Sequence, residues 1–165
     1  FITGFPTWGT LISLSINGKI ILGIADFPAL NERYVGYGKI SYKLINNRKK
    51  ILKVKSNSLS KSILSSTSTY AFKNRYDKNI FEKILKKVKT VHMGGDCYQY
   101  CLLADGYIDI VLESGLNSYD IRALIPIVKN SGGSIKTWDG GNPKNGGKVI
   151  ATSSRNLLSI VQSLM

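Results

Sequence analysis

The spacing of apolar residues changes near residue 60, and this change limits the folds that the chain can adopt. Before residue 60, apolar and polar residues alternate, as in the segment LISLSI at residues 11–16. After it, apolar residues recur at three- and four-residue intervals, as in Ile80, Ile84 and Val88. Alternation is typical of strands with one buried face, and the longer interval is typical of amphipathic helices. The order predicts an α/β fold of the layered α+β kind, in which an antiparallel strand meander precedes a mixed α/β layer.

Residues 7–36 are predicted to form the antiparallel meander. Asn17 and Gly18 can adopt the left-handed backbone conformations of a tight hairpin turn, and Pro28 lies in a segment that breaks the second strand. The three expected strands are residues 12–16, 19–26 and 32–38.

Residues 39–61 are polar and basic, and we expect them to form a hairpin-like surface excursion with its turn at Asn46-Asn47. A boundary near residue 60 then divides the chain into two parts. Residues 1–60 are expected to supply the last strands of an antiparallel-sheet lobe, and residues 61–165 an α/β lobe.

The second part is predicted to alternate between strands and helices. The expected strands are residues 62–66, 90–93, 108–113, 134–138 and 148–152. The expected helices are residues 78–89, 96–105, 119–130 and 155–164. Gly132-Gly133 should end the third of these helices, because glycine readily adopts the backbone conformation that terminates a helix.

Composition excludes several classes of protein. The chain has 165 residues, of which 43% are apolar and 20% charged, and this excludes fibrous and disordered proteins. No apolar run approaches the roughly 18 residues of a membrane span. With two cysteines and no secretory leader, the expected location is the reducing cytoplasm. Because the chain begins with Phe1 rather than Met, we expect it to be a portion of a longer protein.

The net charge of +13 is confined to one region. Residues 39–89 contain 15 of the 23 Lys and Arg residues but two of the ten acids, whereas the rest of the chain has eight of each sign. The basic region lacks the interleaved aromatic residues of a single-strand binder and has no recognisable recognition helix. We therefore expect a solvated basic face and not a nucleic-acid partner, although a basic binding module remains an alternative function.

Two places could hold a phosphorylated ligand. Gly94-Gly95-Asp96 lies between a predicted strand and a predicted helix, where free backbone N–H groups can hold an anion, although such glycines also serve as simple turns and Asp96 could be a helix cap. Glu113 ends a strand and Asp120 starts the next helix, so both should reach the carboxyl edge of the sheet, where α/β folds bind ligands. Carboxylate oxygens suit Mg²⁺, although Asp120 could equally stabilise its own helix.

The remaining motifs give weaker evidence for a functional site. Cys97 and Cys101 lie four residues apart with His92 nearby, but a fourth ligand for zinc is missing, so they are interpreted as buried small side chains. The glycine-rich segment 141–148 resembles a phosphate loop only superficially, because Val149 stands where that motif needs Ser or Thr. His92 has no nucleophile motif around it, so a hydrolase triad is unsupported.

Taken in order, several segments resemble the inositol monophosphatase-like superfamily, most closely its histidinol-phosphatase branch. These segments are residues 1–12 (FITGFPTWGTLI), 94–98 (GGDCY) with 102–104 (LLA), 109–113 (DIVLE), 119–120 (YD) with 123–128 (ALIPIV), and 132–133 (GG). They cover nearly the whole chain in the order and spacing of the family.

The resemblance implies Mg²⁺-dependent hydrolysis of a small phosphate monoester by a metal-activated water, in an enzyme that is usually a homodimer. Asp120 matches the family's carboxyl-terminal metal ligand, Glu113 matches its contact with the organic part of the substrate, and Gly94, Gly95 and Asp96 match its substrate loop. In the histidinol-phosphatase branch, Asp96 and Glu113 could pair with the amine and imidazole of the substrate. The implied reaction is histidinol phosphate to histidinol, in histidine biosynthesis, and the alternative is inositol 1-phosphate or a related sugar phosphate.

Ser66, Thr67 and Ser68 follow a strand that approaches the same site, and Thr67 and Ser68 are carried as polar substrate contacts. The family's other metal ligands, a Glu and the acids of an Asp-Pro-Ile/Leu-Asp-Gly-Thr motif, would precede Phe1, together with its water-activating Thr. The 165 residues therefore retain none of the catalytic motif and are expected to be inactive alone. A catalytically inactive remnant that packs against a partner is a further alternative. In either case the meander should show an unpaired edge and an exposed apolar face.

Overall fold

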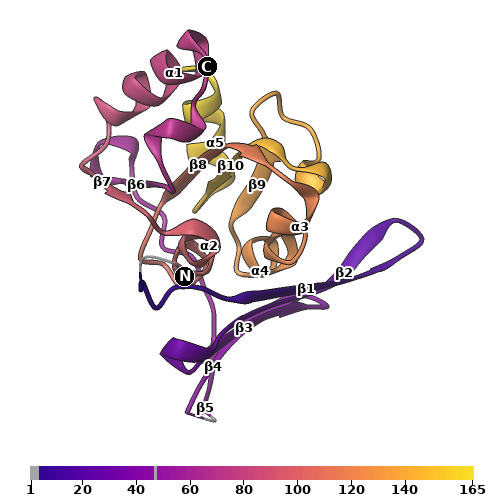
Figure 1. The fold of residues 1–165 in the computed structure, drawn as a ribbon. Coiled ribbons are helices and arrows are strands. Elements are labelled where there is room, and N and C mark those ends of the chain that lie inside the picture. Colours follow the sequence, from indigo (N-terminus) through magenta and orange to yellow (C-terminus); the bar gives the residue numbers. More distant parts are fainter. Residues whose placement is uncertain (1–3, 47) are drawn as a thin grey trace.

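The computed structural model describes residues 4–46 and 48–165, which form two five-stranded sheets with helices between and outside them (Figure 1). The first sheet has the strand order β1-β2-β3-β4-β5 and the second β7-β6-β8-β10-β9. Helices α2 and α4 lie between the sheets, and α1 and α5 lie beyond the second sheet (Figure 1). This arrangement confirms the predicted layered α/β class. The first three residues of the segment 1–12 and Asn47 of the expected turn lie outside the described residues.

The first sheet is antiparallel throughout. Its strands are β1 (Thr10–Ile16), β2 (Lys19–Phe27), β3 (Glu32–Tyr37), β4 (Ile40–Ile45) and β5 (Arg48–Ile51). Asn17 and Gly18 have φ of 48° and 74°, so the β1–β2 turn has the left-handed backbone that the sequence predicted. Pro28–Leu30 form a short 3₁₀ helix between β2 and β3.

The interpretation of residues 39–61 as a surface excursion is wrong for β4, which continues the sheet beside β3 and is partly buried, whereas β5 is exposed at the sheet edge. Ser41 is buried, and its hydroxyl donates to the carbonyl of Ile127 at 2.8 Å. Lys43, which made the segment look like surface, is only 9% exposed because it forms ion pairs with Glu32 and Asp105. A lysine paired with acids that are distant in sequence can occupy the inner face of a strand.

The second sheet is mixed. Its strands are β6 (Ile63–Ser66), β7 (Thr90–Met93), β8 (Ile110–Leu116), β9 (Ser134–Thr137) and β10 (Gly147–Thr152). Strand β6 is parallel to β7 and β8, whereas β10 is antiparallel to β8 and β9. The helices are α1 (Arg75–Leu85), α2 (Asp96–Ala104), α3 (Ser118–Ile121), α4 (Leu124–Asn130) and α5 (Arg155–Gln162).

Two predicted helices differ from the structure. The helix expected over residues 78–89 begins at Arg75, because the Asn74 side chain caps it by accepting from the backbone N–H of Asp77 at 2.8 Å. The helix expected over residues 119–130 is split into α3 and α4. Pro126 has no N–H to donate to the carbonyl four residues earlier. The helical hydrogen bonds therefore cannot continue without interruption from α3 into α4.

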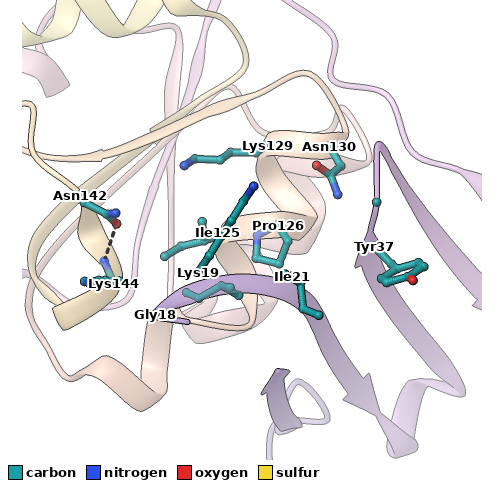
Figure 2. A pocket seen from close by; sticks show the side chains of 12 residues that line it. Gly18, Lys19, Ile21, Tyr37, Ile125, Pro126, Lys129, Asn130, Asn142 and Lys144 are labelled. Carbon is teal, nitrogen blue, oxygen red and sulfur yellow. Dashed lines mark hydrogen bonds between the residues drawn. The ribbon is translucent and has the colours of Figure 1, made fainter. Parts of the chain in front are cut away.

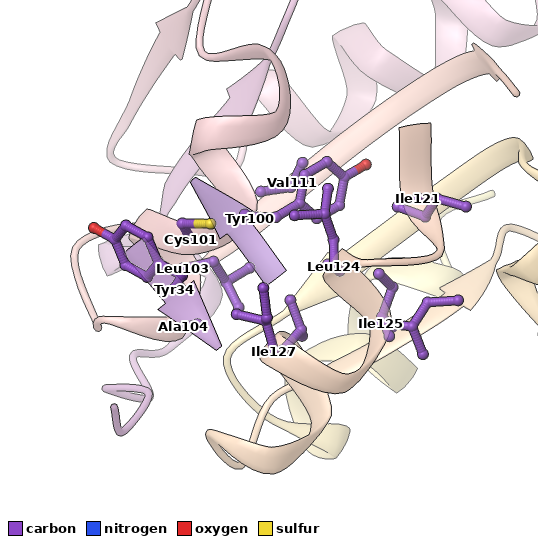
Figure 3. Packing of buried hydrophobic residues seen from close by; sticks show 14 of the residues in the cluster. Tyr34, Tyr100, Cys101, Leu103, Ala104, Val111, Ile121, Leu124, Ile125 and Ile127 are labelled. Carbon is purple, nitrogen blue, oxygen red and sulfur yellow. The ribbon is translucent and has the colours of Figure 1, made fainter. Parts of the chain in front are cut away.

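Glycines let the first sheet approach α4 closely. A Cβ on Gly23 would lie 1.9 Å from the carbonyl oxygen of Ala123, and one on Gly36 would lie 2.4 Å from the backbone nitrogen of Ile127. Around this contact the sheets and helices share one apolar core, in which Tyr34 of the first sheet packs with Tyr100, Leu103 and Ile127 among other residues (Figure 3). A second core lies between the second sheet and helices α1 and α5.

The opposite face of the first sheet is apolar and uncovered by the described residues. Ile12 and Leu14 on β1 pair with Ile24 and Leu22 on β2, which alternate with the inward-facing Gly23. Ile12 is 53% exposed and Leu14 is 48% exposed, and β1 is an edge strand. None of the helices in residues 4–46 and 48–165 has the length and apolar character needed to cross a membrane.

The division of the chain at residue 60 remains a prediction. The chain passes from the first sheet to the second between β5 and β6. Leu52, which lies in this connection, packs into the core that both sheets share.

Candidate active site

Glu113 is held in a fixed position at the centre of the candidate site. It is 2% exposed on β8, and its Oε1 accepts hydrogen bonds from the backbone N–H of Thr67 at 2.6 Å and from Nε2 of Gln99 at 2.5 Å. Hydrogen bonds to a charged acceptor are strong, and these two come from different elements, the end of β6 and the helix α2. These bonds to Oε1 orient the side chain, and the side chain of Thr67 also interacts with the carboxylate.

The surroundings of Glu113 change its acidity in opposing ways. Burial is the largest cause and raises the pKa of Glu113 above its ordinary value, and the nearby charge of Asp96 adds to this. The hydrogen bonds from Gln99 and Thr67 lower it, but less than burial raises it. The fold thus disfavours a lone negative charge at Glu113, which a cationic group beside it would stabilise.

The Gly94-Gly95 loop is tied to the end of β6. The backbone N–H of Gly94 donates to the carbonyl oxygens of Ser66 and Thr67, both at 3.1 Å, and Gly94 has a left-handed φ of 87°. Gly95 is buried, and a Cβ there would lie 2.8 Å from Cβ of Gln99. The loop, Thr67 and Glu113 are consequently brought together at one corner of the second sheet.

Asp96 begins α2 but does not cap it. Gly95 occupies the N-cap position with no side-chain hydrogen bond, and Asp96 is exposed with a left-handed φ of 45°. A left-handed conformation costs free energy for any residue with a Cβ, although Asp tolerates it better than most. With this left-handed backbone, Asp96 presents an exposed carboxylate at the corner that holds Glu113.

Asp120 stabilises the helix that carries it. Its Oδ2 accepts from the backbone N–H of Asn117 at 2.7 Å, and the Asn117 side chain accepts from the backbone of Asp120, which together form a capping box. The electrostatic explanation considered from the sequence is thus present in the structure, and it uses one of the two carboxylate oxygens.

The buried phenol of Tyr100 lies within electrostatic range of the three acids. Burial raises the pKa of Tyr100 well above its ordinary value, and the charges of Glu113, Asp96 and Asp120 each raise it further. Its hydroxyl, which has no hydrogen-bond partner among the described residues, points toward the side of the core that holds Ile121 of α3 (Figure 3). Glu113, Asp96 and Asp120 therefore share one electrostatic environment.

The three polar residues after β6 have different environments. The Ser66 hydroxyl is buried without a hydrogen-bond partner among the described residues, and Thr67 Oγ1 accepts from Gln99 Nε2 at 3.2 Å. Ser68 Oγ accepts from the backbone N–H of Tyr70 at 3.1 Å and so caps the 3₁₀ helix Thr69–Ala71. Thr67 contacts the site directly, whereas the hydroxyl of Ser68 is used in a local turn.

Sequence reasoning missed Gln99, which connects these parts. Besides its bonds to Glu113 and Thr67, its Oε1 accepts from the hydroxyl of Ser65 at 2.8 Å, and Ser65 lies 3.4 Å from Nδ1 of His92. The available signal was an amide in an otherwise apolar turn of α2, one turn after Gly95. Burying an amide requires partners, and here they are the candidate site residues.

The carboxylates do not complete a metal site by themselves. Among residues 4–46 and 48–165, no group of three or more His, Cys, Asp or Glu side chains is arranged to hold a metal ion. Asp120 has a second carboxylate oxygen and could supply one hard ligand. Cys97 and Cys101 are free thiols whose pKa values are raised by burial, which agrees with their interpretation as buried small side chains.

Comparisons with known proteins agree with the fold. The inositol monophosphatase family model matches residues 1–164. A bifunctional phosphatase named IMPL2, chloroplastic, from Arabidopsis thaliana is 43% identical over 140 residues, which are 85% of this chain and 40% of that protein. A histidinol-phosphatase from Mycobacterium tuberculosis is 29% identical over 161 residues, covering 93% of this chain and 60% of that protein.

Solved structures give the same result. An inositol monophosphatase from Zymomonas mobilis superposes with a TM-score of 0.91 at 35% identity, covering 99% of this chain and 64% of that one. The chain thus spans less than two thirds of the length of these relatives. With the family model matched over almost every residue, the chain belongs to the inositol monophosphatase family.

Proposed function

We propose that the chain is part of a metal-dependent phosphatase that hydrolyses small phosphate monoesters, with Mg²⁺ as the metal. The observation that carries the proposal is the hydrogen bonding of the buried Glu113 carboxylate to Thr67 and Gln99, at the corner where Gly94 is tied to the end of β6. A phosphate bound with metal at this corner would meet the amino end of α2, and an organic part would meet the carboxylates.

We assign Asp120 as a metal ligand through its second oxygen, and Gly94, Gly95, Asp96, Glu113 and Thr67 as substrate contacts. The hydroxyl of Ser68 is retained only as a contact that would have to leave its local turn. Since the described residues hold no group of three metal-binding side chains, we propose that the other ligands and the water-activating group come from residues outside positions 1–165. No chemical step is derived through the metal from these residues.

The preferred substrate is histidinol phosphate. Its amine and imidazole can carry positive charge, and Glu113 and Asp96 place two carboxylates on the organic side of the site, one of them destabilised by burial. The similarity to proteins named histidinol-phosphatase supports this choice. Inositol 1-phosphate is the alternative, because proteins named inositol monophosphatase share the fold.

The test is phosphate release by the protein that carries this chain, measured with and without Mg²⁺ on histidinol phosphate and inositol 1-phosphate. We expect Mg²⁺-dependent turnover with a higher kcat/KM for histidinol phosphate. Preference for inositol 1-phosphate would contradict the substrate while leaving the reaction class intact, and absence of Mg²⁺-dependent release from both would contradict the proposed function. The 165 residues alone serve as the control and are expected to be inactive.

A homodimer and a cytoplasmic location also remain proposals. The relative from Arabidopsis thaliana bears the name of a chloroplast protein. Size-exclusion chromatography with light scattering tests the first proposal, and localisation of a tagged full-length protein tests the second.

A further inference from the structure

A second concave region, here called the lysine pocket, lies away from Glu113 between the start of β2, helix α4 and the short 3₁₀ helix Pro143–Asn145. Its volume is about 610 Å³, within the range of small-molecule sites. Three lysines from these three elements line it: Lys19, Lys129 and Lys144. Figure 2 shows the side chains of Lys19 and Lys129 extending toward the space between α4 and the segment that holds Asn142.

The pocket belongs to the side of the first sheet that α4 already covers. Ile125, Pro126 and Lys129 of α4 line it together with Lys19 and Ile21 of β2, and the missing side chain of Gly23 lets this strand approach Ala123 beside α4. The pocket is therefore built from elements within the described chain. It does not depend on what covers the opposite, apolar face of the sheet.

The positive charge of the pocket is not balanced by the protein. No Asp or Glu lines the pocket, and none of its three lysines takes part in the ion pairs of residues 4–46 and 48–165. These lysines also lie outside the basic stretch 39–89, in the part of the chain whose charges otherwise cancel. Acids outside the stretch 39–89 pair with other cations. Asp105, for example, forms ion pairs with Lys43 and Lys50.

Ordinary structural roles explain only one of the three lysines. Lys129 lies in the last turn of α4, where a cation interacts favourably with the helix dipole. Burial nevertheless lowers the pKa of Lys129, and the neighbouring charge of Lys136 lowers it further. Lys144 lies in the last turn of a 3₁₀ helix of only three residues, whose dipole is small, and Lys19 lies on a strand, so a helix dipole accounts for neither of them.

The remaining walls favour an organic anion over a simple ion. Ile21, Ile125 and Pro126 supply apolar surface beside the lysines, and Tyr37 lies toward the other end of the pocket (Figure 2). Tyr37 is 60% exposed, so its ring is open to contact. A pocket with cations at one end and an apolar wall beside them fits a molecule with a multiply charged head and an apolar body.

We propose that the lysine pocket binds a small phosphorylated organic molecule, with the phosphate held by Lys19, Lys129 and Lys144 and the organic part against Ile125 and Pro126. This site is separate from the proposed active site and does not rest on the proposed function. A phosphate dianion suits three point charges better than a single carboxylate does.

The test uses phenylphosphonate, whose carbon–phosphorus bond a phosphatase cannot hydrolyse, with EDTA present so that a metal-dependent site is silent. Binding to the protein that carries this chain is measured by calorimetry for the wild type and for the double variant Lys19→Ala/Lys129→Ala. The matched control is Lys83→Ala/Lys86→Ala, at two exposed lysines in the last turn and at the C-cap of α1, which removes the same charge. We expect the dissociation constant to rise at least about tenfold in the pocket variant and to stay within about twofold in the control.

Equal weakening in both variants would mark the binding as non-specific attraction to a basic protein and would overturn the proposal. Inorganic phosphate is the second probe, and affinity equal to that of phenylphosphonate would overturn the role of the apolar wall. Should the variant fail to fold, acetylation of the wild-type lysines read by mass spectrometry provides a separate test. Protection of Lys19, Lys129 and Lys144 by phenylphosphonate supports the proposal, and unchanged acetylation of all three overturns it.

Discussion

The two ends of helix α2 are held in different ways. At its carboxyl end, Asp105 has a side chain that is 1% exposed and forms ion pairs with Lys43 at 3.0 Å and Lys50 at 2.5 Å. At its amino end, Asp96 is exposed, has a strained backbone and forms no ion pair with the described residues. The same type of side chain is thus neutralised and buried at one end, and left available at the other.

The difference distinguishes the end of α2 that is held by the first sheet from the end that is proposed to bind substrate. A carboxylate at a helix carboxyl end is unfavourable toward the helix dipole, and two lysines of the first sheet compensate it. Glu32 extends this support, since it contacts Lys43 and accepts from the hydroxyls of Tyr34 and Tyr98 at 2.7 and 2.9 Å. The first sheet therefore anchors α2 at one end, while the other end carries the residues proposed to contact substrate.

The largest effect is expected from breaking the anchored end with Asp105→Asn. Burial alone would lower the pKa of Lys43, but Asp105 and Glu32 outweigh it and raise it, so removing the Asp105 charge leaves a poorly compensated buried cation. We expect the free energy of unfolding to fall by about 3 kcal/mol in urea titration. Lys50→Met, which removes an exposed partner of the same acid, should cost less than about 1 kcal/mol.

If the two ends have separate roles, kcat/KM per folded molecule of Asp105→Asn should stay close to that of the wild type. A large loss of activity with unchanged stability would contradict the comparison.

A second variant, Gln99→Leu, tests the connection between the middle of α2 and the site. Leucine has a similar size but cannot donate to Glu113 and Thr67 or accept from Ser65, so buried polar groups lose their partners. We expect a stability loss of about 2 kcal/mol. Since the hydrogen bond from Gln99 lowers the pKa of Glu113, the acid limb of the pH–activity profile should move to higher pH.

Gln162→Leu is the matched control, because Gln162 on α5 donates to the carbonyl of Trp138 at 3.2 Å and lies outside the candidate site. It should lose stability without moving the pH profile. A profile that moves equally in both variants would show that the Gln99 effect is structural only.

Glu113→Gln separates the charge of the site from its hydrogen bonds, since an amide oxygen can accept from Gln99 and Thr67 as the carboxylate does. Activity on histidinol phosphate should fall about tenfold, equivalent to about 1.4 kcal/mol, while activity on inositol 1-phosphate changes less. Because the folded protein raises the pKa of Glu113, ionisation of this group lowers stability as pH rises through the folded pKa.

The variant should therefore be at least as stable as the wild type at neutral pH, with the difference shrinking as pH falls and Glu113 becomes protonated. Thermal melting across that pH range measures it. A variant that is less stable than the wild type at neutral pH would contradict the proposed destabilisation of the Glu113 charge.

The sequence predicted local features of the molecule better than contacts between residues that are distant along the chain. The strands, the Asn17-Gly18 turn and the Gly94-Gly95 corner follow from local patterns, and the structure contains them. The burial of Lys43 could not be predicted, because its partner Asp105 is distant along the chain and only the layering of the sheets brings them together. The position of Gln99 was missed for the same reason, since its partners lie on β6 and β8.

Local rules also failed where a single residue outweighed a pattern. Apolar spacing favoured one helix over residues 119–130, but the missing N–H of Pro126 divides it into α3 and α4. Asp120 lies in the first turn of α3, where it forms the capping box with Asn117. The residues proposed for the site were named from the sequence and its family resemblance, whereas the contacts that orient them required the tertiary structure.

The smallest effect is expected at the open end of α2, where two variants of Asp96 separate strain from charge. Asn tolerates a left-handed φ and removes only the charge, whereas Gly removes the charge and also relieves the strain at φ 45°. Asp96→Gly should therefore exceed Asp96→Asn in stability by up to about 1 kcal/mol in urea titration. Both should reduce the preference for histidinol phosphate over inositol 1-phosphate to a similar extent, because both lack the carboxylate. Equal stability of the two variants would show that the backbone at Asp96 stores no strain, and an unchanged substrate preference would remove Asp96 from the substrate contacts.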